Sequence, residues 1–141
     1  MADQELPLDE YHRAGLEITK GNPEVYKSLY SRSDDVTLAN PFGAPVRGWD
    51  NVSATLDRAS ENYRDGEVVG FENVVTTMAD DLAYIVEIES YRARVGGGPD
   101  MTPVSVRVTS IFRCEEGVWK LVHRHADPIT GPRAPKSVIQ T

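Results

Sequence analysis

The chain has 141 residues, of which 40% are hydrophobic and 26% charged, a composition that is typical of one globular domain and argues against disorder. Its net charge of −7 at pH 7 disfavours nucleic-acid phosphates and anionic membranes as partners. No apolar run approaches the roughly 20 residues that span a bilayer. The single cysteine, Cys114, favours a reducing compartment, so we expect a cytoplasmic protein that binds neither nucleic acid nor membrane.

The first half of the chain has the spacing of helices. Apolar side chains recur at helical intervals over residues 8–18, 25–30 and 52–63. Gly21 is placed to end the first helix, Pro23 to begin the second, and Asp50 to cap the third. A short strand over residues 36–39 precedes the third helix and leads into a loop that contains two prolines.

The second half alternates between apolar and polar residues, as strands do. We predict strands over residues 67–78, 82–95, 103–114 and 118–127. Helices followed by long strands predict an α+β fold, with three N-terminal helices on one face of an antiparallel sheet. We therefore assign residues 1–127 to one domain and residues 128–141, which contain three prolines, to an extended C-terminal arm.

Particular residues in this order resemble a known superfamily. Residues 29–43, which end in Asn40-Pro41-Phe42-Gly43, look like the ketosteroid isomerase segment that runs from the second helix into the catalytic loop. Arg107-Val108-Thr109 and residues 117–127 look like the last hairpin of SnoaL-like proteins. Over residues 8–127 the chain thus resembles the nuclear transport factor 2-like superfamily, which implies a cone-shaped, curved sheet. That superfamily hosts isomerases, dehydratases, cyclases, hydrolases and binding modules, so the fold selects no activity.

The resemblance to ketosteroid isomerases does not carry their chemistry over. It places the catalytic base at Asn40, the second hydrogen-bond donor at Ser110, and the helix tyrosine near Ala14, one turn from Tyr11. An amide takes no proton at neutral pH, so no isomerisation of that type is expected. Asn40 is left either to hydrogen-bond a ligand or to cap the loop before Pro41.

A second resemblance is to the association domain of calmodulin-dependent kinase. It rests on Ala83-Tyr84-Ile85 and on the closing His-x-His motif. The arginines that line the pocket of that domain match Val86, Ser110 and Ala126 here, so the resemblance implies that the anion site is missing.

The face that each residue of the last hairpin presents depends on its turn. A three-residue loop, Glu115-Glu116-Gly117, would pair Cys114 with Val118. The inner side chains would then be Val108, Ser110, Val122 and Arg124. A loop of two or four residues would instead turn both histidines inward. We favour the three-residue loop.

That register leaves Ile111, Trp119 and Leu121 on the helix-free face of the sheet. This apolar surface predicts a homodimer, with His125 on the interface side. His123, His125 and Asp127 could also chelate a metal, but we favour histidines within an interface and expect neither metal nor cofactor.

In the strand over residues 82–95, we expect Tyr84, Val86 and Ile88 on the pocket side. Glu87 and Glu89 are expected on the opposite side, either solvated or in an interface. The chain is predicted to bind a small neutral or weakly anionic organic ligand in a largely apolar pocket. The alternative is a lyase, isomerase or cyclase-type enzyme for a polyketide- or steroid-like substrate, and no catalytic residue is assigned. The candidate ligand-binding residues are Tyr11, Tyr30, Asn40, Trp49, Tyr84, Val86, Ser110, Val122 and Arg124.

Overall fold

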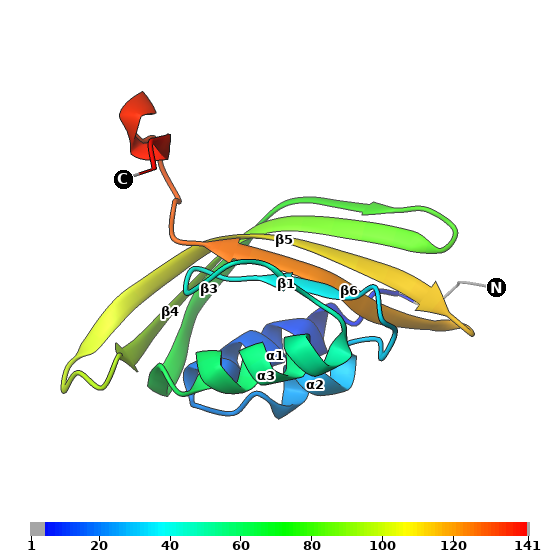
Figure 1. Cartoon of the computed structure of the whole chain (residues 1–141), viewed down its shortest axis with the longest axis horizontal. Helices are drawn as coiled ribbons and strands as arrows, with labels where there is room; N and C mark the ends of the chain where they lie inside the picture. The colour runs from blue at the N-terminus through cyan, green and yellow to red at the C-terminus, as the bar shows by residue number, and fades with distance from the viewer. Residues whose placement is uncertain (1–4, 141) are drawn as a thin grey trace.

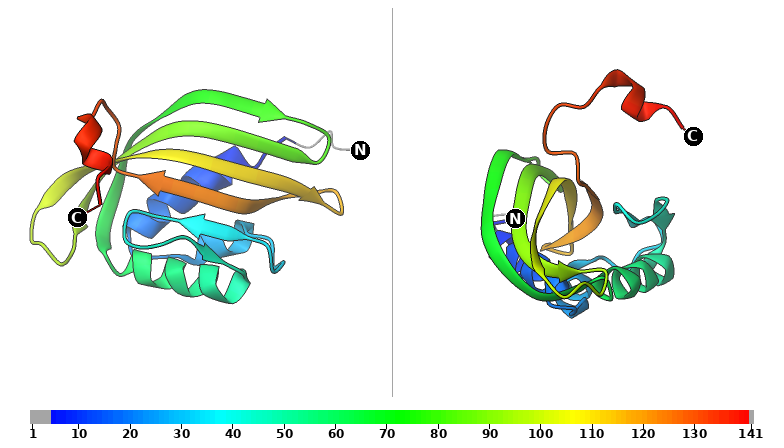
Figure 2. Two further views of the ribbon diagram at one scale, coloured as in Figure 1. Left: turned by 45° about the horizontal axis from the view of Figure 1, so that its top comes forward. Right: turned by 90° about the vertical axis from the view of Figure 1, so that its left-hand side faces the viewer.

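Three helices pack on one face of a six-stranded curved sheet in the computed structural model, which describes residues 5–140 (Figure 1). The sheet has the strand order β2-β1-β6-β5-β4-β3 and curves around the helices without closing (Figure 2). The elements are α1 (Leu8–Thr19), α2 (Glu24–Leu29), β1 (Thr37–Ala39), β2 (Val46–Arg47), α3 (Trp49–Ser60), β3 (Tyr63–Met78), β4 (Leu82–Val95), β5 (Met101–Glu115), β6 (Val118–Asp127) and the 3₁₀ helix η1 (Pro135–Val138).

The predicted α+β fold is confirmed, with one difference in the sheet. Strands β3 to β6 form an antiparallel meander, but the short strand β1 pairs in parallel with β6, so the sheet is mixed. Strand β2, which the sequence did not indicate, pairs with β1 across the loop that follows Ala39. No helix among residues 5–140 is long and apolar enough to cross a membrane.

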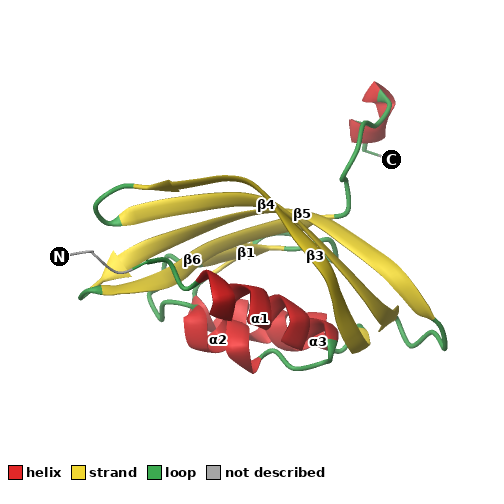
Figure 3. Cartoon of the chain, turned by 180° about the vertical axis from the view of Figure 1, so that it is seen from behind, coloured by secondary structure: helices red, strands yellow, loops and turns green. Residues whose placement is uncertain are grey.

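The helices cover the inner face of the sheet and leave the other face open (Figure 3). Helix α2 begins at Glu24, whose backbone N–H donates to Asn22 Oδ1 at 3.1 Å. Helix α3 begins at Trp49 rather than after Asp50, because the preceding Gly48 takes a φ of 89° that suits glycine. The prediction that Asp50 caps this helix is therefore wrong. Its carboxylate lies in the first turn, where the helix dipole favours a negative charge.

The faces of β4 are the reverse of the prediction. Glu87 and Glu89 are each 1% exposed on the inner face, whereas Tyr84 is 41% exposed on the outer face. The register with β5 explains the reversal, since Glu87 lies opposite Val108 and both side chains point toward the helices. The prediction failed because it assigned the apolar side chains of β4 to the inside, whereas Glu87 and Glu89 are buried and Tyr84 is exposed.

The turn between β5 and β6 has two central residues, not three. Glu116 and Gly117 have φ angles of 52° and 81°, the combination of a type I′ turn, so Glu115 pairs with Val118. This register directs Trp119 and Leu121 inward, where they are 4% and 0% exposed. The prediction that both lie on the helix-free face is therefore wrong.

A bulge in β6 then restores the inward direction of Arg124. The register shifts by one residue between the Phe112–Leu121 pair and the Ile111–His123 pair, so Val122 is the extra residue. After the bulge Arg124 lies opposite Ser110 and is 8% exposed. Arg124 thus points inward as predicted, although the predicted turn is wrong.

The position of Leu121 can be tested by comparison with Val118, which is 50% exposed on the same strand. We expect Leu121→Ala to lower the free energy of unfolding by about 2–5 kcal/mol, since it opens a cavity in the core. Val118→Ala should change it by about 0.5 kcal/mol or less. Urea unfolding of both variants gives the two values. Equal losses would contradict the two-residue turn.

Candidate functional site

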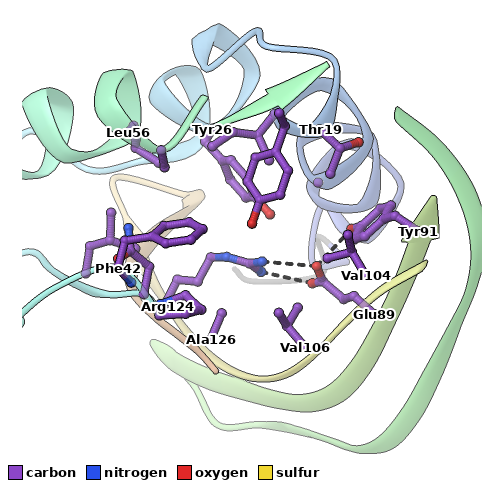
Figure 4. Close-up of a pocket in the computed structure, with 17 residues that line it drawn as sticks. Thr19, Tyr26, Phe42, Leu56, Glu89, Tyr91, Val104, Val106, Arg124 and Ala126 are labelled. Carbon is purple, nitrogen blue, oxygen red and sulfur yellow. Dashed lines mark hydrogen bonds and ion pairs between the residues drawn. The ribbon is translucent and has the colours of Figure 1, made fainter. Parts of the chain in front are cut away.

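A cavity lies between the helices and the inner face of the sheet, and the loop after β1 borders it. Tyr26 and Leu56 enter it from the helices, Val106 and Ala126 from the sheet, and Phe42 from the loop (Figure 4). Its volume is about 60 Å³, which holds only a few water molecules. Its walls are mostly apolar, so the polar groups that reach it decide what it can recognise.

An ion pair between Arg124 of β6 and Glu89 of β4 forms one wall of the cavity. The guanidinium donates two parallel hydrogen bonds to the carboxylate, of 2.9 and 3.0 Å. Both side chains are buried, and such a bidentate geometry is the strongest that this pair of groups can adopt. Because the two charges cancel, the cavity wall is polar without a net charge.

Two tyrosines complete the hydrogen bonds of this pair. Tyr91 donates its hydroxyl to Glu89 at 2.8 Å, and Arg124 donates to the hydroxyl of Tyr11 at 2.5 Å. Tyr11 also hydrogen-bonds Ser110, which links α1 to β5. A Cβ atom at Gly15 would lie 2.1 Å from the Tyr91 hydroxyl, so glycine is required where α1 passes this ring.

The hydroxyl of Tyr26 is a buried polar group at the cavity that has no partner among the described residues. Its ring faces the Arg124 guanidinium, whose carbon lies 4.9 Å from the ring centroid. Tyr26 is 1% exposed, and within residues 5–140 its hydroxyl is the only buried side-chain polar atom that has no hydrogen-bond partner. A buried hydroxyl without a hydrogen-bond partner lowers the stability of the folded state. A ligand or a water molecule that accepts from the Tyr26 hydroxyl would remove this cost.

Burial controls the protonation of these groups. It raises the pKa values of Tyr11, Tyr26 and Tyr91 far above the usual value for tyrosine, so all three stay neutral near pH 7. Burial alone would lower the pKa of Arg124, but the neighbouring Glu89 charge raises it, so the guanidinium stays protonated. Tyr26 can therefore donate a hydrogen bond to an acceptor in the cavity.

The loop that follows β1 separates the cavity from a second hollow of about 290 Å³. Asn40, Phe42 and Ala59 line both spaces. Phe42 is 51% exposed, and its ring lies 6.0 Å from that of Tyr63, measured between centroids. Phe42 is thus one of three residues at the boundary between the two spaces.

A second polar cluster surrounds the other buried carboxylate, Glu87. It bonds to His12 Nε2 at 2.8 Å through one oxygen, and it accepts from Asn73 at 3.1 Å through the other. The His12 ring stacks on Phe71 at 4.0 Å. The hydrogen bond to Glu87 raises the pKa of His12. Burial works against the Glu87 charge, but the bonds from His12 and Asn73 leave its pKa lowered.

The structure brings together only part of the predicted set. Asn40 and Arg124 line the cavity, and Tyr11 and Ser110 lie behind Arg124. Asn40 accepts the Phe42 backbone N–H at 3.0 Å, so it also caps its loop.

The other predicted residues lie elsewhere. Tyr30 donates to the Thr37 carbonyl, and the Trp49 ring packs against the Arg32 guanidinium. Val122 belongs to the hydrophobic core between the helices and the sheet. Tyr84 and Val86 are on the outer face of β4, so the expectation that they face the pocket is wrong.

Sequence reasoning missed Glu89, Tyr26 and Tyr91 as cavity residues. Tyr26 was recognised only as part of an apolar helix face. For β4 a usable signal existed over the full strand, because Ser90, Arg92 and Arg94 make the far end of the outer face polar. Inward-facing Ala83, Ile85, Tyr91 and Ala93 flank the two glutamates on the inner face.

The histidines of β6 lie on the outer face. His123 bonds to the Thr37 hydroxyl at 2.7 Å, and His125 lies 3.4 Å from Asp127. Within residues 5–140 no three His, Cys, Asp or Glu side chains are grouped so as to hold a metal ion.

The family model of the SnoaL-like domain matches residues 7–129. Three similar solved structures are a provisionally assigned dehydratase of the NTF2-like family from Streptomyces avermitilis, an NTF2-like superfamily protein from Salmonella enterica and a ketosteroid isomerase-like protein from Erwinia carotovora. In that order, identity is 20%, 15% and 16%, and the TM-score is 0.68, 0.71 and 0.66. The matches cover 88%, 95% and 88% of this chain and 91%, 92% and 88% of the other chains. No curated protein sequence matches the chain.

Removal of one partner of the buried ion pair should strongly destabilise the fold. Arg124→Met leaves Glu89 buried without its counter-charge, and we expect a loss of about 3–5 kcal/mol in the free energy of unfolding. The double variant Arg124→Met/Glu89→Leu should recover part of that loss. The control is Arg107→Met, which breaks an exposed pair with Asp127 and should lose about 1 kcal/mol or less. Equal losses for Arg124→Met and Arg107→Met in chemical unfolding would contradict this role.

The His12–Glu87 contact should make stability depend on pH. Because the folded pKa of His12 is raised above its ordinary 6.5, its contribution is complete below about pH 6.5 and is lost as the pH rises through the raised value. Because the pKa of Glu87 is lowered, its protonation changes stability only at pH values below this range. We expect the melting temperature of the wild type, relative to His12→Gln, to fall between pH 6.5 and 8.5.

The control for this measurement is His123→Gln. Burial lowers the pKa of His123, so its contribution to stability changes mainly below pH 6.5. The difference in melting temperature between the wild type and His123→Gln should therefore stay nearly constant from pH 6.5 to 8.5. A constant difference between the wild type and His12→Gln across the range would show that the contact with Glu87 carries no protonation-dependent stability.

Proposed function

Because the chain belongs to the SnoaL-like domain family, we propose that its cavity binds a small neutral organic molecule that carries a carbonyl or hydroxyl oxygen. The observation that carries this proposal is the buried, unpartnered hydroxyl of Tyr26. A ligand oxygen that accepts from this hydroxyl satisfies it, while the apolar walls bind the rest of the molecule.

The charges of the site favour a neutral ligand over an anion. Arg124 lies at the cavity wall, and its two terminal nitrogens donate to Glu89. This edge of the guanidinium is therefore not available to bind a ligand carboxylate. An anionic ligand would have to displace Glu89 or share the guanidinium with it, which leaves a buried negative charge without compensation. Of the two ligand types expected from the sequence, the neutral one therefore has the better physical support.

The ligand enters past Phe42. The cavity of about 60 Å³ is too small for a drug-sized molecule, since typical ligand pockets span about 300–1,000 Å³. The hollow on the other side of the loop adds about 290 Å³ once the Phe42 ring moves aside. The joined space reaches the lower end of the typical range, which favours a one-ring molecule over a steroid.

The alternative function is catalysis of the lyase or isomerase type. The observation that favours it is that Glu89 and the unpartnered Tyr26 hydroxyl belong to residues that line the same, mostly apolar cavity. A carboxylate base and a neutral hydroxyl donor are the two groups that proton abstraction next to a carbonyl requires. The similar structures named as dehydratase and ketosteroid isomerase-like are consistent with such chemistry.

The proposed setting is a cytoplasmic homodimer. Trp119 and Leu121 belong to the core, so they cannot form the apolar interface that the sequence predicted. The outer sheet face still carries Tyr84 opposite Ile111, with Val86 and Ile88 along the same strand. The single cysteine supports a reducing compartment.

The ligand proposal can be tested with cyclohexanone and methylenecyclohexane, which share a shape but differ in the acceptor oxygen. We expect the wild type to prefer the ketone by about 3–10-fold, the value of one neutral hydrogen bond. Tyr26→Phe should bring this ratio close to one. Tyr30→Phe, which removes a buried hydroxyl that faces away from the cavity, should leave it unchanged. NMR titration of the cavity methyl groups gives both affinities, and failure of both probes to shift them would refute the proposal.

The catalytic alternative has its own readout in the same solution. A general base next to the bound ketone would exchange its α-protons for deuterium in D₂O faster than buffer does. If Glu89 is that base, Glu89→Gln should lose at least about 100-fold of the exchange rate. If the ketone binds but its α-protons exchange no faster than in buffer, the catalytic alternative is refuted and the binding proposal stands.

A further inference from the structure

We infer that the hollow of about 290 Å³ between helix α3 and the loop after β1 binds a small monocarboxylate, with the guanidinium of Arg58 as its main partner. This inference goes beyond the proposed function, because it concerns the hollow and not the cavity behind the loop. In the cavity the terminal nitrogens of Arg124 already donate to Glu89, so a carboxylate finds no available cation there. The neutral ligand uses Tyr26 and the carboxylate uses Arg58, so each proposal can fail without the other.

The walls of the hollow are apolar on one side. Ala44 and Val46 line it from the loop and from β2, and Ala59 lines it from α3. The ring of Phe42, which is 51% exposed, also borders it. These side chains can cover a short apolar or aromatic body, whose burial contributes binding free energy.

The Arg58 side chain brings a positive charge without a counter-charge. One of its terminal nitrogens donates to the Thr55 hydroxyl at 3.0 Å, and this is the only hydrogen bond or ion pair of the side chain within residues 5–140. The nearest acidic residues in the sequence lie elsewhere, since Asp57 pairs with Lys27 at 2.7 Å and Glu61 lines a different hollow. Most N–H groups of the guanidinium therefore remain available for the two oxygens of a carboxylate.

Two further side chains add hydrogen-bond donors to the same hollow. Thr55 is 9% exposed, and because its oxygen accepts from Arg58, its own O–H proton has no acceptor among residues 5–140. Asn40 accepts the Phe42 backbone N–H through Oδ1, which leaves the two N–H groups of its amide without a partner in the described chain. A backbone N–H bonds only to an acceptor, so this contact fixes the orientation of the amide.

The net charge around the hollow selects the class of anion. None of the described residues that line it is an Asp or a Glu, although the whole chain carries −7. The single charge of Arg58 balances the single charge of a carboxylate. A phosphate dianion would keep an uncompensated charge beside an acidic protein, which repels it. The hollow thus suits a monocarboxylate with a short apolar body better than a phosphate.

The test compares the affinities of benzoate and benzamide, which share a ring and differ in the charge of the polar group. We expect the wild type to bind benzoate at least about tenfold more tightly, since a charge-assisted pair outweighs a neutral hydrogen bond. Arg58→Gln should bring the ratio close to one, and Arg58→Lys, which keeps the charge but not the fork, should retain part of it. Arg133→Gln removes the same charge from the exposed C-terminal arm and should leave the ratio unchanged. Equal ratios for the wild type and Arg58→Gln would overturn the inference.

The same NMR titration locates the bound carboxylate. The methyl groups of Ala44 and Val46 line the hollow only, whereas those of Val106 and Ala126 line the cavity only. We expect benzoate to shift the first pair and not the second, with an affinity that Tyr26→Phe leaves unchanged. Shifts confined to Val106 and Ala126, or loss of benzoate binding in Tyr26→Phe, would contradict a site in the hollow. Benzoate binding to the hollow in a protein that shows no preference for the ketone would refute only the proposed function.

Discussion

The rest of the structure depends on the buried ion pair between Glu89 and Arg124. Burying two charges carries a penalty of several kcal/mol per ion, and only complete pairing offsets it. The pair is bidentate, and Tyr11 and Tyr91 occupy further hydrogen-bonding positions. Its members come from β4 and β6, and Tyr11 comes from α1, so the pair holds one helix and two strands that are not neighbours in the sheet at a defined distance.

The same pair determines what the cavity can recognise. With the charges of Glu89 and Arg124 directed at one another, the buried hydroxyl of Tyr26 is left as a donor that a ligand could use. The apolar walls then set the shape of the ligand, and the proposed entry route passes Phe42. A site of this kind serves a binding protein as it stands. It serves an enzyme only if Glu89 can take a proton while Arg124 remains bound to it, which is why binding is the primary proposal.

The two faces of the sheet have separate roles in this account. The inner face carries two acidic residues that are buried because helix α1 and strand β6 supply partners, His12 for Glu87 and Arg124 for Glu89. The outer face carries apolar and aromatic side chains that no helix covers. Tyr84, Val86 and Ile88 of β4 therefore lie where assembly is proposed, whereas Glu89 of the same strand lies where ligand binding is proposed.

The sequence by itself determined the α+β class and the bounds of β4 and β6, because local periodicity reports which segments form strands. Arg124 points inward as predicted only because the bulge at Val122 offsets the error in the predicted turn. Only the tertiary structure decided which face of β4 is buried. Glu87 and Glu89 are stable inside only through His12 and Arg124, which lie 75 and 35 residues away along the chain. The bulge at Val122 was likewise invisible, since it reconciles an inward Leu121 with an inward Arg124. Periodicity cannot report either feature, because long-range pairing and packing, not local pattern, provide the free energy that selects them.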